Sequence, residues 1–217
     1  MVRITHCFLF LSLVISFSCS NEDDITGSGN IVFEDRELSS FQKISNSSSI
    51  NLVIKQGASQ SVRVTADDNI IGLVKTNVEN GMLKVDLPRG NYNDITILIT
   101  INLPIIDGIE NSGSGNITIS EFEQLRNLKI TNQGSGSITA NGSGAVLDLT
   151  NTGSGSYFGF DFIIQDVEVR NTGSGSCEIF CSGTLNGSNS GSGSIFYKGN
   201  PELNISNTGT GVVSSMD

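Results

Sequence analysis

The sequence has few of the residues on which enzyme and nucleic-acid sites most often depend. Its 217 residues include one histidine, His6, and no tryptophan, and 12 Lys and Arg stand against 22 Asp and Glu. A chain with a formal net charge of -10 offers no basic surface for nucleic acid or anionic lipid. Because the histidine lies near the N-terminus, the later serines lack the base that a serine nucleophile needs. We therefore expect neither nucleic-acid binding nor serine-hydrolase chemistry.

Cysteine is also scarce, at positions Cys7, Cys19, Cys177 and Cys181. Four residues of extended strand span roughly 13 Å, which is too far for a disulfide between Cys177 and Cys181 unless the strand bends. No histidine or second cysteine pair is present to complete a zinc site with them. We expect Cys177 to be a core thiol, leave its pairing with Cys181 open, and expect no metal or cofactor.

Residues 1–18 have the pattern of a secretory signal peptide. Arg3 supplies positive charge, and the apolar run over residues 8–15 is too short to span a bilayer. Ser18-Cys19-Ser20 resembles a bacterial lipoprotein cleavage site, although Ser16 stands where leucine is usual. Cys19 would then carry lipid, and residues 19–29 would form an acidic tether. We expect a lipid anchor at the outer membrane or cell surface; the alternative is ordinary cleavage, with Cys19 as a spare residue.

A six-residue phrase recurs along the second half of the chain: Asn, a small polar residue, Gly-Ser-Gly and a final residue. Its first glycine falls at positions 113, 134, 153, 173, 191 and 209, giving steps of 21, 19, 20, 18 and 18 residues. Repeats of this length are typical of stacked-coil architectures. Apolar residues alternate with polar ones between the phrases, as in strands with one buried face, whereas a flexible Gly/Ser linker needs no such alternation. The pattern predicts an all-β fold, a single-stranded parallel β-helix with coils of about 18–21 residues.

The asparagine that opens each phrase shares its parity with the apolar residues, so it should point inward at a corner. Stacked amides can hydrogen-bond to one another and to the backbone of the turn. The glycines would supply positive φ angles and close approach between coils. We expect a structural asparagine ladder of Asn111, Asn132, Asn151, Asn171, Asn189 and Asn207.

Residues 30–108 contain strand-like segments without the strict period. The expected strands are residues 31–33, 41–44, 50–55, 61–66, 82–87 and 95–102. Asn80-Gly81 predicts a hairpin turn, and residues 69–76 fit either one helical turn or a kinked strand. Since no change of composition forces a boundary, we expect one continuous solenoid over residues 30–217. Irregular coils at 30–108 would cap the regular coils at 109–217.

Several short motifs follow one another in a specific order, although each alone is weak. They are Phe41-x-x-Ile44, Leu52-Val53-Ile54-Lys55-Gln56-Gly57, Val62-x-Val64-x-Ala66-Asp67-Asp68-Asn69, Thr76-x-Val78-x-Asn80-Gly81-x-Leu83-x-Val85 and Asn111-Ser112-Gly113-Ser114-Gly115-Asn116-Ile117. Together, over residues 30–212, they resemble the bacterial family named "putative auto-transporter adhesin, head GIN domain". The resemblance implies a right-handed β-helix, an envelope or surface location and an adhesin-like role, and it brings no catalytic residues.

An enzyme has to be considered, because parallel β-helices also serve polysaccharide lyases and hydrolases. The carboxylate pairs Glu121/Glu123 and Asp166/Glu168 each share one strand face by their i, i+2 spacing. A hydrolase needs two carboxylates held close together with separated pKa values, and a lyase needs a strong base beside them. The basic residues of the repeats are scattered, so we expect solvated carboxylates and no enzyme.

We therefore expect a non-enzymatic, adhesin-like surface lipoprotein that binds an unknown cell-surface or matrix partner, either a protein or a glycan. The candidate binding surface consists of Phe158, Phe160, Phe162 and Phe196. One alternative is a carbohydrate-processing or glycan-binding β-helix protein. Another is an envelope scaffold that self-assembles as a homo-oligomer.

Overall fold

The computed structural model describes residues 24–217, so the predicted signal peptide and the predicted lipidation of Cys19 lie outside the described part. The strands are β1 Ile25–Thr26, β2 Ile31–Asp35, β3 Lys43–Asn46, β4 Asn51–Gln56, β5 Ser61–Asp67, β6 Lys75–Glu79, β7 Met82–Asp86, β8 Tyr92–Asn93, β9 Ile97–Leu103, β10 Gly108–Asn111, β11 Ile117–Asn132, β12 Ile138–Asn151, β13 Tyr157–Asn171, β14 Cys177–Cys181, β15 Thr184–Asn189, β16 Ile195–Lys198, β17 Glu202–Asn207 and β18 Val213–Ser215. One 3₁₀ turn, η1, covers Ile71–Leu73. No helix within residues 24–217 has the length and apolar character needed to cross a membrane.

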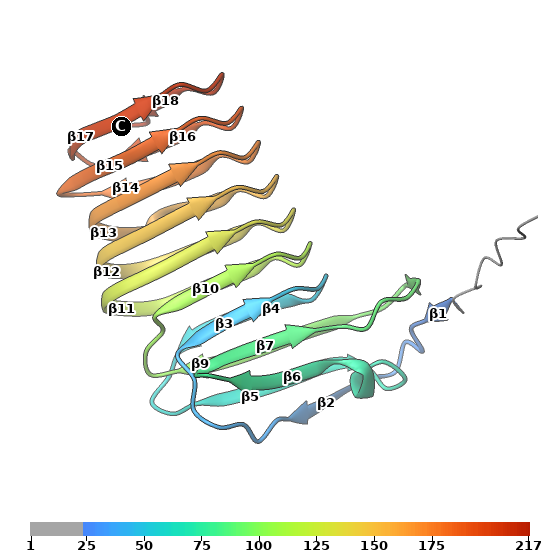
Figure 1. Cartoon of the computed structure of the whole chain (residues 1–217). Coiled ribbons are helices and arrows are strands. Elements are labelled where there is room, and N and C mark those ends of the chain that lie inside the picture. Colours follow the sequence, from blue (N-terminus) through green and yellow to red (C-terminus); the bar gives the residue numbers. More distant parts are fainter. Residues whose placement is uncertain (1–23) are drawn as a thin grey trace, which may run out of the picture.

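From β10 onward the chain winds into parallel coils that stack in register (Figure 1). Ile109 of β10 pairs with Ile130 of β11, and the last residues of these two strands, Asn111 and Asn132, pair with each other. The register breaks only at the bends of the long strands, where bulges separate the straight segments. The predicted β-solenoid of parallel coils is confirmed.

The first half of the chain does not stack in sequence order. Strand β3 lies between β10 on one side and β7 on the other, and β4 lies between β11 and β9 (Figure 1). The coil containing β7 and β9 therefore stacks beneath the earlier coil of β3 and β4. The outermost strands β2, β5 and β6 are antiparallel, and they end the stack of parallel coils.

Part of the expected tether is also built into this end of the molecule. Strand β1 pairs in parallel with β8. Gly29 donates a backbone hydrogen bond of 2.7 Å to Asp67, and the Ser28 hydroxyl donates one of 2.6 Å to Asp68. We call residues 25–30 the N-terminal latch. The latch fixes where the chain leaves the capped end.

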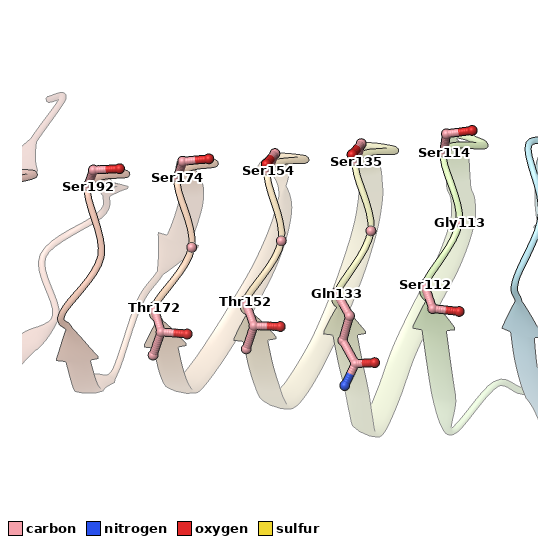
Figure 2. Close-up of a pocket in the computed structure, with 13 residues that line it drawn as sticks. Ser112, Gly113, Ser114, Gln133, Ser135, Thr152, Ser154, Thr172, Ser174 and Ser192 are labelled. Carbon is pink, nitrogen blue, oxygen red and sulfur yellow. The ribbon is translucent and has the colours of Figure 1, made fainter. Parts of the chain in front are cut away.

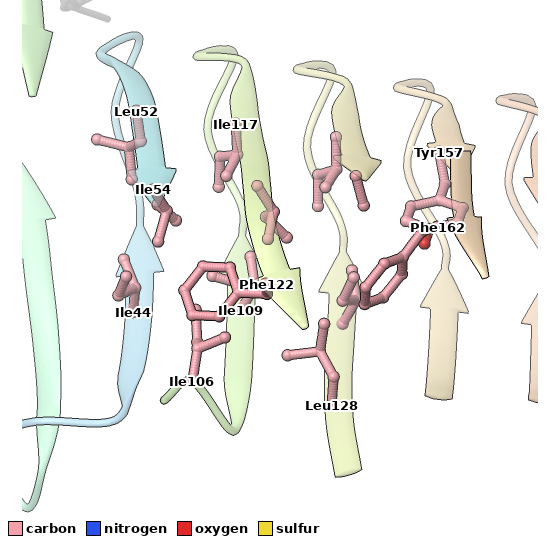
Figure 3. Close-up of a cluster of buried hydrophobic side chains, with 14 of the residues drawn as sticks. Ile44, Leu52, Ile54, Ile106, Ile109, Ile117, Phe122, Leu128, Tyr157 and Phe162 are labelled. Atoms are coloured by element: carbon pink, nitrogen blue, oxygen red, sulfur yellow. The ribbon is translucent and has the colours of Figure 1, made fainter. Parts of the chain in front are cut away.

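The core is a set of apolar columns between the two walls of strands (Figure 3). One column runs through Ile117, Ile138, Tyr157, Cys177 and Ile195, all of which are buried. Cys177 and Cys181 are both buried and unpaired, which answers the question of their disulfide. Burial raises the pKa of the Cys177 thiol to about 12, so this thiol stays protonated near neutral pH.

Candidate functional site

The repeated phrases form one corner of every regular coil, and the glycines make close stacking of these corners possible. A Cβ atom on Gly134 would lie 1.9 Å from the carbonyl oxygen of Gly113, and one on Gly136 would lie 2.0 Å from that of Gly115. None of the phrase glycines has a positive φ; the glycines that do are Gly29, Gly81, Gly142, Gly187 and Gly199. The expectation of positive φ at the corners is therefore wrong. Close approach between coils is the reason for glycine there.

The asparagines of the phrases lie inside the corner. Asn111, Asn132, Asn151, Asn171 and Asn189 are buried, whereas Asn207 in the last coil is exposed. The Nδ2 groups of Asn151, Asn171 and Asn189 each donate a 3.2 Å bond to the Oδ1 of the next asparagine. Asn111 donates to Asn132 over 3.3 Å.

The amide stack is not continuous, and it begins one coil earlier than the phrases do. The Oδ1 atoms of Asn111 and Asn151 are buried without a hydrogen-bond partner. Asn46, which pairs in register with Asn111, is the first inward asparagine, and its Nδ2 donates to the Ile50 carbonyl over 2.9 Å. Sequence reasoning missed Asn46 because Ser47, Ser48 and Ser49 follow it in place of the Gly-Ser-Gly pattern.

Outside the corner, the small residues line a shallow groove of about 620 Å³ that runs across successive coils (Figure 2). Two rows of side chains border it, and all of them are exposed. The first row is Ser112, Gln133, Thr152 and Thr172, and the second is Ser114, Ser135, Ser154, Ser174 and Ser192. Neighbouring strands lie roughly 4.7–4.9 Å apart, so hydroxyl groups recur at about that spacing along the groove.

The side chains of these two rows make no hydrogen bonds within residues 24–217. A third row of serines, which includes Ser137 and Ser156, does make hydrogen bonds between coils. The backbone N–H of Ser156 donates 3.1 Å to the hydroxyl of Ser137, and that of Ser176 donates 3.1 Å to the hydroxyl of Ser156. The third row therefore holds the coils together, whereas the first two rows leave their hydroxyl groups free for a ligand. We call these two rows the corner groove.

The chemistry of the corner groove is polar and uncharged. All of its lining residues are glycine, serine, threonine or glutamine. Ser and Thr hydroxyls and the Gln133 amide both donate and accept hydrogen bonds, so the groove complements a ligand that does the same. It has no cation to favour a phosphate or carboxylate, and no aromatic face to stack a base.

Three of the four carboxylates considered for catalysis, Glu121, Glu123 and Asp166, have structural partners. Glu121 forms a 3.3 Å ion pair with Lys55, and Glu123 accepts a hydrogen bond from Ser143. Asp166 accepts a 3.0 Å bond from the backbone of Thr184. No group of three or more potential metal ligands occurs within residues 24–217.

The predicted aromatic surface is only partly present. Phe158 is 41% exposed, while Phe160 is half-buried beneath the Lys198 ammonium, 4.6 Å from its ring centre. Phe196 is half-buried and lies in register with Glu178, which separates it from Phe158. Phe162 is 1% exposed and points into the core, so it cannot belong to a binding surface (Figure 3). The register shift after Gly159 exchanges the inward and outward positions along the rest of the strand. Simple alternation counted from Phe158 therefore put Phe162 on the wrong face.

Comparison with known proteins extends the resemblance seen in the sequence. The model of the family described as "Putative auto-transporter adhesin, head GIN domain" matches residues 40–201. Proteins with curated functions gave no significant sequence match.

Three crystal structures share the fold. A "putative adhesin" from Bacteroides fragilis has a TM-score of 0.74 at 21% identity, covering 88% of this chain and 100% of its own. A "putative adhesin" from Parabacteroides merdae has a TM-score of 0.57 at 18% identity, covering 90% and 100%. A "putative lipid binding protein" from Parabacteroides distasonis has a TM-score of 0.56 at 22% identity, covering 90% and 100%.

Proposed function

The chain belongs to the family described as "Putative auto-transporter adhesin, head GIN domain", and on this premise we propose that it is a non-enzymatic, lipid-anchored surface protein whose corner groove binds a neutral glycan. The adhesin-type family supports a surface location and an adhesive role. The glycan and the anchor are our own additions. The proposal of a glycan ligand rests on the two rows of exposed side chains, most of them with free hydroxyl groups, that line the groove.

A glycan suits these rows because its hydroxyl groups both donate and accept, and because an extended chain presents them repeatedly along one line. One contact between neutral groups is weak, with a net contribution of about 0.5–1.5 kcal/mol. Several coils that contact one chain add such contacts together, and many copies on one surface add avidity. An uncharged groove also avoids the cost of desolvating charged groups.

Binding without turnover is supported by the state of the reactive groups. Glu121, Glu123 and Asp166 are engaged in an ion pair or hydrogen bonds, and the two described thiols are buried. The proposed anchor rests on the signal-like N-terminus and on Cys19. The N-terminal latch would attach that anchor at the capped end, while the groove extends over the coils beyond it.

The experiment is a glycan array probed with the wild-type domain and with the double variant Ser135→Glu/Ser174→Glu. Both serines are exposed and unbonded, so the variant should fold while placing two carboxylates in the uncharged groove. Ser59→Glu, at an exposed serine away from the groove, is the matched control. We expect neutral polysaccharides to bind wild type and control, and the double variant to bind at least about tenfold more weakly.

Failure of every neutral glycan to bind, or equal binding by the double variant, contradicts the proposal. The same glycans are then incubated with the protein and assayed for new reducing ends and unsaturated products. Turnover that disappears on replacing Glu121, Glu123, Asp166 or Glu168 would establish an enzyme in place of a binding protein.

A further inference from the structure

A second cavity lies at the opposite part of the fold, where the chain order of the coils is inverted. It has a volume of about 760 Å³, within the range of roughly 300–1,000 Å³ that is typical of small-molecule sites. Four segments meet there: the entry into β3, the connection from β4 to β5, the turn between β6 and β7, and the connection from β9 to β10. We call it the crossover pocket.

Backbone hydrogen bonds hold the walls of the crossover pocket in place. The N–H groups of Gln42 and Lys43 donate to the Gly81 carbonyl over 3.2 and 3.3 Å, and Asp107 N–H donates to the Gln42 carbonyl over 2.8 Å. The Gln60 amide accepts from Phe41 N–H over 3.1 Å and donates to the carbonyls of Leu38 and Ser39. The pocket is therefore preformed, and a ligand need not order it.

The side chains around the pocket combine an apolar part with free polar groups. Phe41, Pro104 and Ile105 supply the apolar part, and Ile105 is 36% exposed. Ser40, Gln42, Lys43, Asn80 and Asp107 also line the pocket, and their side chains have no hydrogen-bond or ion-pair partner within residues 24–217. The pocket lining therefore combines five side chains that have unpaired donor or acceptor groups with an apolar surface.

We propose that the crossover pocket binds a neutral sugar, such as one terminal hexose unit of a glycan. A pyranose ring has an apolar C–H face, which Pro104 and Ile105 would contact, and hydroxyl groups at its edge. Lys43 and the amides of Gln42 and Asn80 can donate to those hydroxyls, while Asp107 can accept from them. One cation and one anion at the rim leave no net charge to attract a phosphate or polyanion. The pocket is separate from the corner groove, and this proposal does not depend on ligand binding there.

The test uses saturation-transfer NMR with a panel of methyl glycosides of neutral hexoses, followed by titration of any binder while the backbone amides of Gly81 and Ile105 are observed. We expect at least one glycoside to receive saturation and to shift those two amides. Asp107→Asn combined with Lys43→Met removes the two charged groups at the rim and leaves the backbone hydrogen bonds of the pocket in place. This double variant should raise the Kd at least about tenfold. Asp148→Asn, at a surface carboxylate paired with Lys129, is the control and should leave the Kd unchanged.

Several outcomes overturn the proposal: no glycoside binds, the shifted amides lie elsewhere, or the double variant binds as well as wild type with an unchanged melting temperature. Binding of a free amino acid but of no glycoside would also reject the sugar. The corner-groove variant Ser135→Glu/Ser174→Glu should keep full pocket binding, so failure of one site leaves the other testable.

Discussion

At the scale of single residues, the corner depends on two side-chain choices, asparagine inside and glycine between coils. The glycines face carbonyl oxygens of the preceding coil at distances that no Cβ atom tolerates. The corner after Asn46 has serines in place of the glycines. It stacks on the coil of β7, which ends at Asp86 and is not followed by a Gly-Ser-Gly phrase, so no such corner lies against these serines on that side. The glycine pattern therefore marks corners stacked on other corners.

Gly134→Ala should destabilise the protein strongly, because its Cβ would lie 1.9 Å from the carbonyl oxygen of Gly113. Overpacking typically costs about 1–3 kcal/mol, and here the obstructing atom belongs to the backbone. Gly72→Ala is the control, since nothing lies within 4 Å of a Cβ there, and it should change stability by no more than about 0.5 kcal/mol. Chemical denaturation measures both, and equal stability of the two variants would contradict this account of the corner.

Asn171→Leu should lower stability by about 1–3 kcal/mol, because it removes one partner from a buried amide pair on each side. Asn171 accepts from Asn151 and donates to Asn189, each over 3.2 Å. Replacement leaves the Asn189 Oδ1 buried without that donor. Asn127→Leu, at an exposed asparagine on β11, is the matched control and should cost less than about 0.5 kcal/mol. Wild-type stability of Asn171→Leu would mean that the amide stack contributes nothing.

Much of this residue-level picture could be predicted from the sequence, because a fixed period aligns equivalent residues whatever the coil shape. The inward columns and the asparagine positions follow from that alignment. The free acceptors of Asn111 and Asn151 could not be predicted, since they depend on how each amide is turned within its corner.

At the scale of elements, strand positions were predictable and strand irregularities were not. The predicted strand 61–66 is observed as β5, Ser61–Asp67, and Asn80-Gly81 forms the predicted hairpin turn with φ angles of 52° and 73°. Residues 69–76 were predicted to form either one helical turn or a kinked strand. They contain the short helical turn η1, followed by the start of strand β6. The alternation of apolar and polar residues does not reveal the bulge after Gly159. Phe162 was therefore predicted to lie on the outer face of the strand, whereas it lies on the inner face.

The N-terminal latch should loosen in acid. The hydrogen bonds from Ser28 and then Asn30 lower the pKa of Asp68 below its ordinary value of 3.8. Because the folded state favours the charged form, the contribution of Asp68 is complete above pH 3.8 and is lost as the pH falls through the lowered pKa. Amide protection factors of residues 28–30, measured from neutral to acid pH, should fall there before those of the regular coils.

Asp68→Asn should reduce latch protection at neutral pH and flatten this pH dependence, whereas Asp148→Asn on the outer face should do neither. Protection of residues 28–30 that stays constant into acid in the wild type would show that Asp68 does not hold the latch. Asp68→Asn leaves Asp67 unchanged, and Asp67 accepts hydrogen bonds from the backbone N–H groups of Gly29 and Thr96. The variant therefore distinguishes the contribution of Asp68 from that of Asp67.

At the scale of the whole molecule, the order of the first coils could not be read from the sequence. Residues 30–108 carry no repeated corner phrase, so nothing in them specifies which strand stacks on which. Strand β3 pairs with both β7 and β10, contacts that join residues far apart in the chain. This inversion encloses the crossover pocket, which is why sequence analysis indicated no such site.

The proposed anchor gives the whole molecule its orientation, and it can be tested at one residue. Cys19→Ser should abolish labelling by a fatty-acid analogue and release the protein from membranes, because each buried methylene of an acyl chain contributes about 0.8 kcal/mol to membrane binding. Cys7→Ser changes a cysteine of the predicted signal peptide and should leave both labelling and membrane association intact. If the Cys19→Ser protein remains membrane-bound after carbonate washing, the lipid anchor is wrong. A released protein that still binds its glycan would show that the anchor positions the groove without forming part of it.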